Sequence, residues 1–175
     1  MKISRPTEHE YDVNSYQNRY IQRVTGDDAL KTLSENLSIV DNFFKNIPEE
    51  KLHFRYAEGK WTIKEIISHL IDTERVMTYR ALRIARNDQT DLPGYDQDAF
   101  VANTPIDKYT YNDLVDELVM LRQANLFFFK SLSDEDMKKK GTANGNVVSV
   151  GALLFIIFGH IEHHFNVMKD LYLKK

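Results

Sequence analysis

The chain has 175 residues, of which 42% are hydrophobic and 28% charged, a composition that is typical of a folded globular protein and excludes a disordered or low-complexity chain. Lys and Arg number 23 and Asp and Glu number 26, so the formal net charge is −3. Proteins that bind nucleic acid through its phosphates usually carry a basic surplus, so this charge argues against nucleic acid as a partner.

The length predicts a single domain, residues 1–175, in which residues 1–25 form an N-terminal arm with a short helix near residues 13–24. The start of the chain is polar and charged and lacks the apolar segment of a signal peptide. The longest apolar run, residues 150–158, is far shorter than the ~20 residues of a membrane-spanning helix. We therefore expect a cytoplasmic protein with no membrane partner.

The first two long helices are predicted over residues 27–47 and 62–86, where apolar residues recur at spacings of three and four. In the second of these segments, Thr62 and Glu65 form a T-x-x-E capping box directly before the apolar run. Arginines crowd its second half: Arg75, Arg80, Arg83 and Arg86.

Two further helices are predicted over residues 111–132 and 149–171. Four such segments with little strand signal predict an all-α fold, a four-helix bundle. The connection between the second and third helices, residues 87–109, is long for a bundle, and long connections are often functional. Its length would let helices two and three run in a crossover arrangement.

Three histidines are predicted to face the core of this bundle. His160 and His164 interrupt the apolar stripe of the fourth helix, and a four-residue step places their side chains roughly 5–6 Å apart at Cβ, which suits two ligands of one ion. His69 lies in an apolar face of the second helix. Each buried imidazole costs desolvation energy unless it has a partner, and one shared metal ion would partner all three. Three His ligands with an open fourth position is the composition of a catalytic zinc site.

The same histidines have a plainer interpretation as core residues with one hydrogen bond each, because an H-x-x-x-H step alone is a weak metal signal. His163 is interpreted as a residue of the helix flank that could support a ligand from outside. The chain has 0 Cys, which excludes disulfides, thiolate metal sites and a cysteine nucleophile. Any nucleophilic thiol must therefore come from another molecule.

Several stretches resemble the DinB/YfiT-like superfamily. Residues 61–70 (W-T-I-K-E-I-I-S-H-L) resemble the W-[ST]-x-x-E-x-x-x-H-L stretch of that family, and residues 72–86 continue the match. Residues 92–100 (L-P-G-Y-D-Q-D-A-F) look like the loop that follows in one branch, and residues 159–164 (G-H-I-E-H-H) resemble the closing G-H-x-x-H-H. The resemblance covers roughly residues 15–172.

This resemblance implies a four-helix bundle with a crossover connection and one divalent metal ion per chain, Zn or Ni, held by His69, His160 and His164. The family includes bacillithiol- and mycothiol-dependent S-transferases, a thiol-dependent maleylpyruvate isomerase and metal-dependent hydrolases. It does not imply the DNA polymerase that shares the DinB name. The branch that the chain most resembles has no activity that the motif assigns, so the resemblance leaves the reaction open.

We expect a metal-dependent enzyme that activates water or a small-molecule thiol and acts on a small molecule, as a hydrolase or a thiol S-transferase. Asp72 could orient a ligand or act as a catalytic base. Arg80 and Arg83 could bind a carboxylate of the substrate, and Tyr79, Tyr95 and Phe100 could form walls of the substrate pocket. Solvated helix flanks and ordinary packing explain these residues equally well.

Two other functions remain open, a metal-binding bundle without turnover, such as a stress-response binding protein, and a dimerising scaffold whose histidines are core residues. The resemblance favours a homodimer, since many relatives pair through bundle helices. Three consecutive residues, Phe127, Phe128 and Phe129, would add an apolar surface of the kind that often marks an interface. Alternatively, residues 1–25 cover that surface.

Overall fold

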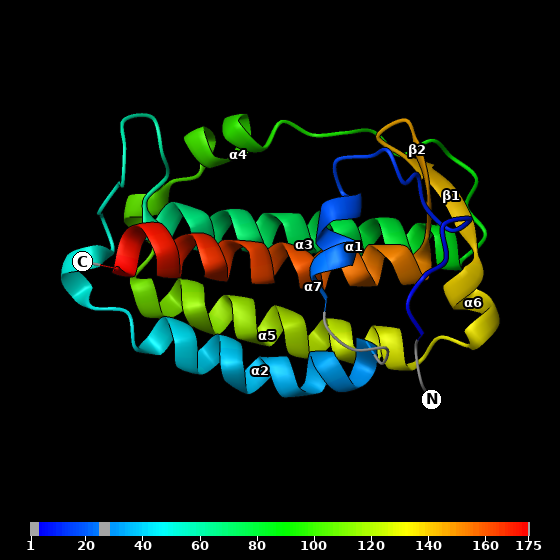
Figure 1. Ribbon diagram of the computed structural model, residues 1–175, viewed down its shortest axis with the longest axis horizontal. Helices are drawn as coiled ribbons and strands as arrows, with labels where there is room; N and C mark the ends of the chain where they lie inside the picture. The colour runs from blue at the N-terminus through cyan, green and yellow to red at the C-terminus, as the bar shows by residue number, and fades with distance from the viewer. Residues whose placement is uncertain (1–3, 25–28, 175) are drawn as a thin grey trace.

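Four long helices lie side by side in the computed structural model (Figure 1), which describes residues 4–24 and 29–174 and, over residues 29–36, the backbone alone. They are α2 (Ala29–Lys45), α3 (Ile63–Ala85), α5 (Tyr111–Lys130) and α7 (Val150–Val167). Each falls within one of the four predicted segments, although the first two residues predicted for the first helix lie outside the described residues. After α7 the chain continues in a π-helical segment, Met168–Leu173.

Side chains with local hydrogen-bonding capacity mark where these helices begin. At the start of α5, the Thr110 hydroxyl accepts a hydrogen bond from the backbone N–H of Asp113, and the Asp113 carboxylate accepts one from the backbone N–H of Thr110, which forms a second capping box. Ser149 caps α7 in a similar way through its hydroxyl. Such caps stabilise a helix start by typically ~1 kcal/mol, so they fix where each helix enters the bundle.

The helices pack in a defined order. α3 packs against both α5 and α7, and α2 packs against α5. In Figure 1, α3 and α5 run from left to right, whereas α2 and α7 run in the opposite direction. The connection between α3 and α5 therefore returns along the bundle, and on the way it forms the short helix α4 (Gln97–Asn103) and a 3₁₀ turn, Ile106–Lys108.

Helix α7 is the core helix of the molecule. Residues 150–161 are all buried, and a helix that is apolar on every side is one that its neighbours surround. The stretch Val150–Leu173 is long and apolar enough to cross a membrane by length and composition alone, but 78% of its most apolar window is buried inside the bundle. A core helix passes the same test, so this stretch is weak evidence for a membrane span.

A short β-hairpin requires a correction to the predicted all-α class. After α6 (Asp134–Lys138), strands β1 (Lys140–Ala143) and β2 (Asn146–Ser149) pair antiparallel, with Gly141 opposite Val148. The turn residues Asn144 and Gly145 have φ values of 52° and 74°. Asn-Gly is the preferred pair for a two-residue hairpin turn with positive φ at both positions. This dipeptide was the sequence signal for the hairpin.

The N-terminal arm packs on α7 through α1 (Asn18–Arg23), in agreement with the predicted short helix. Tyr20 and Ile21 of α1 are buried. A Cβ atom at Gly159 of α7 would clash with the carbonyl oxygen of Tyr20, so only glycine allows α1 to approach this closely. The close approach places Tyr20 beside the histidine that follows Gly159 in the chain.

Candidate metal centre

The predicted capping box holds the start of α3 two turns before its histidine. The Thr62 hydroxyl accepts a hydrogen bond from the backbone N–H of Glu65, and the Glu65 carboxylate accepts one from the backbone N–H of Thr62 at 2.6 Å. Buried Ile66 and Leu70 lie close in sequence to His69 on α3 and anchor this part of the helix in the core. The position of His69 is therefore set by capping and packing together.

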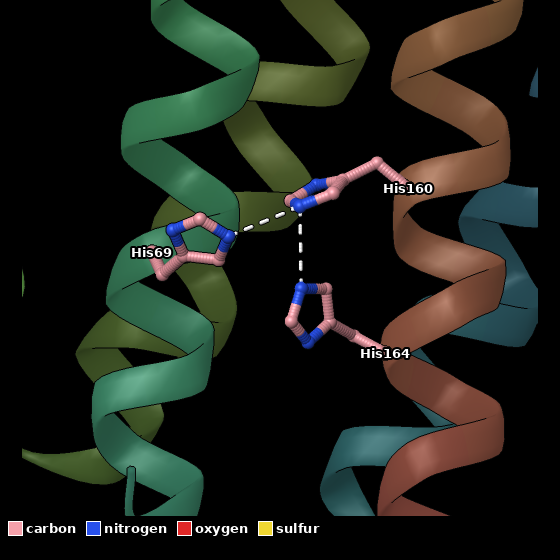
Figure 2. A group of neighbouring side chains, drawn as sticks. All are labelled: His69, His160 and His164. Atoms are coloured by element: carbon pink, nitrogen blue, oxygen red, sulfur yellow. Dashed lines mark hydrogen bonds between the residues drawn. The ribbon is translucent and has the colours of Figure 1, made fainter. Parts of the chain in front are cut away.

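The three predicted histidines converge between α3 and α7 (Figure 2). The Nε2 atom of His160 lies 3.0 Å from Nε2 of His69 and 3.2 Å from Nε2 of His164. One ligand nitrogen from each ring lies within 4.8 Å of the other two, and all three residues are buried. The inward phase that the sequence predicted for these residues is therefore what the structure shows.

Hydrogen bonding alone does not satisfy this arrangement. A neutral imidazole nitrogen carries either one hydrogen or one lone pair, so Nε2 of His160 can form a hydrogen bond with His69 or with His164, but not with both. Three nitrogens bound at ~2.0–2.1 Å to one tetrahedral ion lie roughly 3.4 Å apart. The observed separations from His160 are close to that value, so one ion could bind nitrogens that hydrogen bonds leave unpaired.

Burial keeps these rings neutral. It lowers the pKa of His69 to about 4, and it lowers the pKa values of His160 and His164 well below their ordinary value, with repulsion between neighbouring imidazolium charges acting in the same direction. Metal ions bind neutral imidazole, and the cluster therefore does not have to lose protons at neutral pH before it binds one.

Aromatic rings surround the cluster. The ring centroid of Trp61 lies 4.7 Å from that of His69, and the Tyr20 ring meets His160 edge-on at 5.1 Å. Nδ1 of His164 is buried and has no hydrogen-bond partner among the described residues. A ligating histidine usually donates its second N–H to an acceptor, so a water molecule would have to serve His164.

The cluster lies between two cavities that share Gln97 of α4. One cavity, of about 130 Å³, is lined by His160 together with Arg80 and residues of α1, α3 and the connection to α4. The other, of about 360 Å³, is lined by His164 and His163 and by residues near Trp61. Small molecules could therefore approach the histidines from two sides.

Only some of the predicted substrate residues lie at these cavities. Arg80 is buried and lines the cavity beside His160. Arg83 instead donates hydrogen bonds to the Asp88 carboxylate and to the Tyr79 hydroxyl, and half-exposed Tyr79 lines neither cavity. The structure thus brings Arg80 to the histidines and not Arg83 or Tyr79.

Asp72 and Phe100 line a separate surface groove of about 490 Å³, which no histidine lines. The Asp72 carboxylate lies 3.8 Å from the Arg75 guanidinium, and burial raises the pKa of the Asp72 carboxyl group. Phe100 packs against the ring of Tyr95 with centroids 5.0 Å apart, and Tyr95 lines the cavity that holds Arg80. The catalytic role of Asp72 and the pocket role of Phe100 stay predictions.

Sequence reasoning missed several residues that line the cavity beside His160, among them Tyr20 on α1, Gln97 on α4 and Asn144 in the hairpin turn. These three belong to segments outside the four long helices. For Tyr20 the available signal was Gly159, directly before His160, because a glycine inside a helix often marks close approach of another backbone. For Asn144 it was the Asn-Gly turn.

Comparison with known proteins supports the fold. The sequence model of the DinB superfamily matches residues 32–168, whereas no curated protein matches the chain. Among solved structures, the chain is similar to YfiT from Bacillus subtilis, described as a probable metal-dependent hydrolase with an unusual four-helix bundle topology. The TM-score is 0.75 at 16% identity, over 94% of this chain and 96% of YfiT. The predicted four-helix bundle and the family resemblance are confirmed.

Proposed function

The chain belongs to the DinB superfamily, and we propose that it is a metal-dependent enzyme whose His69, His160 and His164 together hold one divalent ion, Zn or Ni. The observation that carries the proposal is the meeting of three buried, neutral imidazoles from two helices around one nitrogen, Nε2 of His160, which cannot hydrogen-bond to both others. Imidazole ligands suit both metals.

Three neutral ligands would leave a bound ion its full charge and an open position, where it would lower the pKa of a water or thiol toward neutrality. The chain's own residues hold the ligands in place: α3 and α7 pack directly against each other, and Tyr20 and Trp61 restrict the rings from outside. With water as the activated molecule, the enzyme is a hydrolase of a small molecule. This is the function that we propose first.

Transfer of an external thiol is the second candidate, and the two cavities favour it. A transferase must hold a thiol and an acceptor at once, and the histidines border one cavity on each side. With 0 Cys in the chain, the thiol would be a separate low-molecular-weight substrate. Turnover that requires an added thiol would identify the transferase, and turnover in water alone would identify the hydrolase. Metal binding without turnover, either in water alone or with an added thiol, would identify the protein as a non-catalytic metal-binding bundle.

The metal site is tested by comparing His164→Ala with His163→Ala. The two residues are neighbours on α7 and border the same cavity, but only His164 contributes a nitrogen to the cluster. Each protein is stripped of metal and titrated with zinc and with nickel by calorimetry. We expect His164→Ala to lose most of its metal affinity and His163→Ala to lose about 10–100-fold or less, as for a residue that only supports a ligand.

Equal affinity in the two variants, or tighter binding by His164→Ala, would show that the site has to be rebuilt around His163. The unmodified protein should bind one ion per chain. If it binds none, the histidines are core residues and the proposed function fails.

A further inference from the structure

Arg80 is a buried cation that has no anionic partner among the described side chains. Its residue is 3% exposed, and none of the described acidic side chains lies within ion-pair distance of it. Nη2 donates to the carbonyl oxygen of Pro93 at 2.6 Å, and Nη1 makes a long contact of 3.6 Å with the sulfur of Met77. The guanidinium has five N–H donors, so most of its hydrogen-bonding capacity is unused by the described residues.

Among the described residues, the cavity that Arg80 shares with His160 offers it no negative charge, whereas Asp12 lines a second, smaller cavity beside Arg80 without forming an ion pair with it. The described residues that line the cavity beside His160 include phenols and amides, but no carboxylate. Burial lowers the pKa of Arg80 from its ordinary value, yet a guanidinium stays protonated at neutral pH. Burying an unpaired charge raises the free energy of the folded protein. An anion that enters the cavity and pairs with Arg80 would offset this desolvation penalty.

Neighbouring segments hold this charge at a fixed position. The backbone N–H of Leu92 donates to the carbonyl oxygen of Thr142 at 3.0 Å, which attaches the connection after α3 to the hairpin. A Cβ atom at Gly94 would clash with the Asn144 side chain, so the glycine lets the two segments close over the cavity. The hydroxyl of Tyr95 is hydrogen-bonded to Thr73 Oγ1 at 2.7 Å, and both residues line the cavity.

From this arrangement we infer that the cavity binds the carboxylate of a small organic acid on the Arg80 guanidinium, with the rest of the acid directed toward His160. The planar fork of a guanidinium matches the two oxygens of a carboxylate. A cavity of about 130 Å³ has room for an acid of a few non-hydrogen atoms. Arg80 also lies eleven residues after His69 on α3, about three turns, and therefore near the same face of the helix.

This inference rests on the proposed function for its chemistry, because the acid would be the substrate of the metal centre, but its binding step can be tested without metal. The full chain is stripped with a neutral chelator such as phenanthroline, since a polycarboxylate chelator would itself be a ligand. Thermal unfolding and calorimetry then measure binding of acetate, pyruvate and succinate at millimolar concentration against chloride at equal ionic strength. Inorganic phosphate is tested in parallel.

Three variants accompany the unmodified protein. Arg80→Met removes the charge, Arg80→Lys keeps the charge without the planar fork, and Arg75→Met is the matched control, an exposed arginine on the same helix that is paired with Glu117. We expect at least one of the three acids to stabilise the unmodified protein and Arg75→Met equally. Loss of charge-assisted hydrogen bonds should weaken binding to Arg80→Met roughly 10- to 100-fold, with Arg80→Lys between the two.

Binding to Arg80→Met with unchanged affinity, stabilisation by phosphate and not by the acids, or no stabilisation by any probe would each overturn the inference. If Arg80→Met does not fold because Pro93 loses its donor, Arg80→Lys decides: affinity equal to that of the unmodified protein overturns the inference, and weaker affinity supports it. If the protein binds the acid but no metal ion, the proposed function alone is refuted. If it binds a metal ion but none of the acids, this inference alone is refuted.

Discussion

Acid should destabilise the metal-free protein through its buried histidines, well before most carboxylates are protonated. Burial holds the pKa of His69 at about 4, whereas the pKa of an unfolded histidine is about 6.5. Between pH 6.5 and about 4, His69 is mostly protonated in the unfolded chain and mostly neutral in the folded chain, so the free energy of unfolding falls as pH falls. The contribution of His69 is present in full above pH ~6.5 and is lost as the pH falls through about 4.

The size of this effect follows from the difference between the two pKa values. About 2.5 pH units at 1.36 kcal/mol per unit give about 3 kcal/mol for His69 alone. Burial lowers the pKa values of His160 and His164 in the same direction, so their contributions add to that loss. A typical domain is stable by only ~5–15 kcal/mol, and a loss of this size is readily measured.

The assay is urea unfolding of the metal-stripped protein at several pH values between 5 and 7, compared with His69→Gln, which removes one of the titrating rings. We expect the free energy of unfolding of the unmodified protein to fall more steeply with acid than that of the variant, by up to about 1.4 kcal/mol per pH unit. Parallel curves for the two proteins would refute the assignment of a depressed pKa to His69. Saturating zinc should stabilise the unmodified protein most at the upper end of this range, because protons compete for the same nitrogens.

Two further predictions concern stability and assembly. Removal of the metal should lower the free energy of unfolding but leave the helical circular dichroism in place, because the bundle buries its own apolar residues; complete loss of helicity at room temperature would make the site structural. The predicted homodimer should give a light-scattering mass of twice the 20.5 kDa chain at micromolar concentration, and Phe127→Ser should reduce that mass. Phe127 is 77% exposed, so the described part of the arm does not cover it, and a mass near 20.5 kDa for the unmodified protein would contradict the dimer.

The helices and the phase of the histidines could be predicted because both depend on local sequence. The period of the apolar residues gives the length and the inner face of each helix. His160 and His164 lie one turn apart on the inner face of α7, and His69 lies on the inner face of α3. The core of a small bundle is narrow, so side chains that point inward from neighbouring helices lie close together. The meeting of the three rings could therefore be predicted from the local pattern around each histidine.

The surroundings of the predicted substrate residues were harder to predict because they depend on contacts between segments far apart in the chain. Asp72 lies only three residues after His69, but that step rotates it about 60° away, into a groove with Arg75 and Glu117. Arg80 is distant in sequence from His69 but returns to nearly the same face after about three turns. The helical period alone would have favoured Arg80 over Arg75, yet only the fold shows that a hairpin and a loop close a cavity beside it.

Most of the walls of the cavity beside His160 come from outside the four long helices, so we expect any substrate specificity to be set there. The bundle supplies the three histidines, but Tyr20 comes from the N-terminal arm, Tyr95 from the connection after α3 and Asn144 from the hairpin turn, and these residues wall the cavity beside His160. Each of these segments is held by a glycine or a turn where a side chain would clash or strain, at Gly94 and Gly159 for example. Two chains with the same bundle and the same histidines could therefore act on different molecules, because a shared fold does not fix the shape or charge of the cavity beside the three histidines.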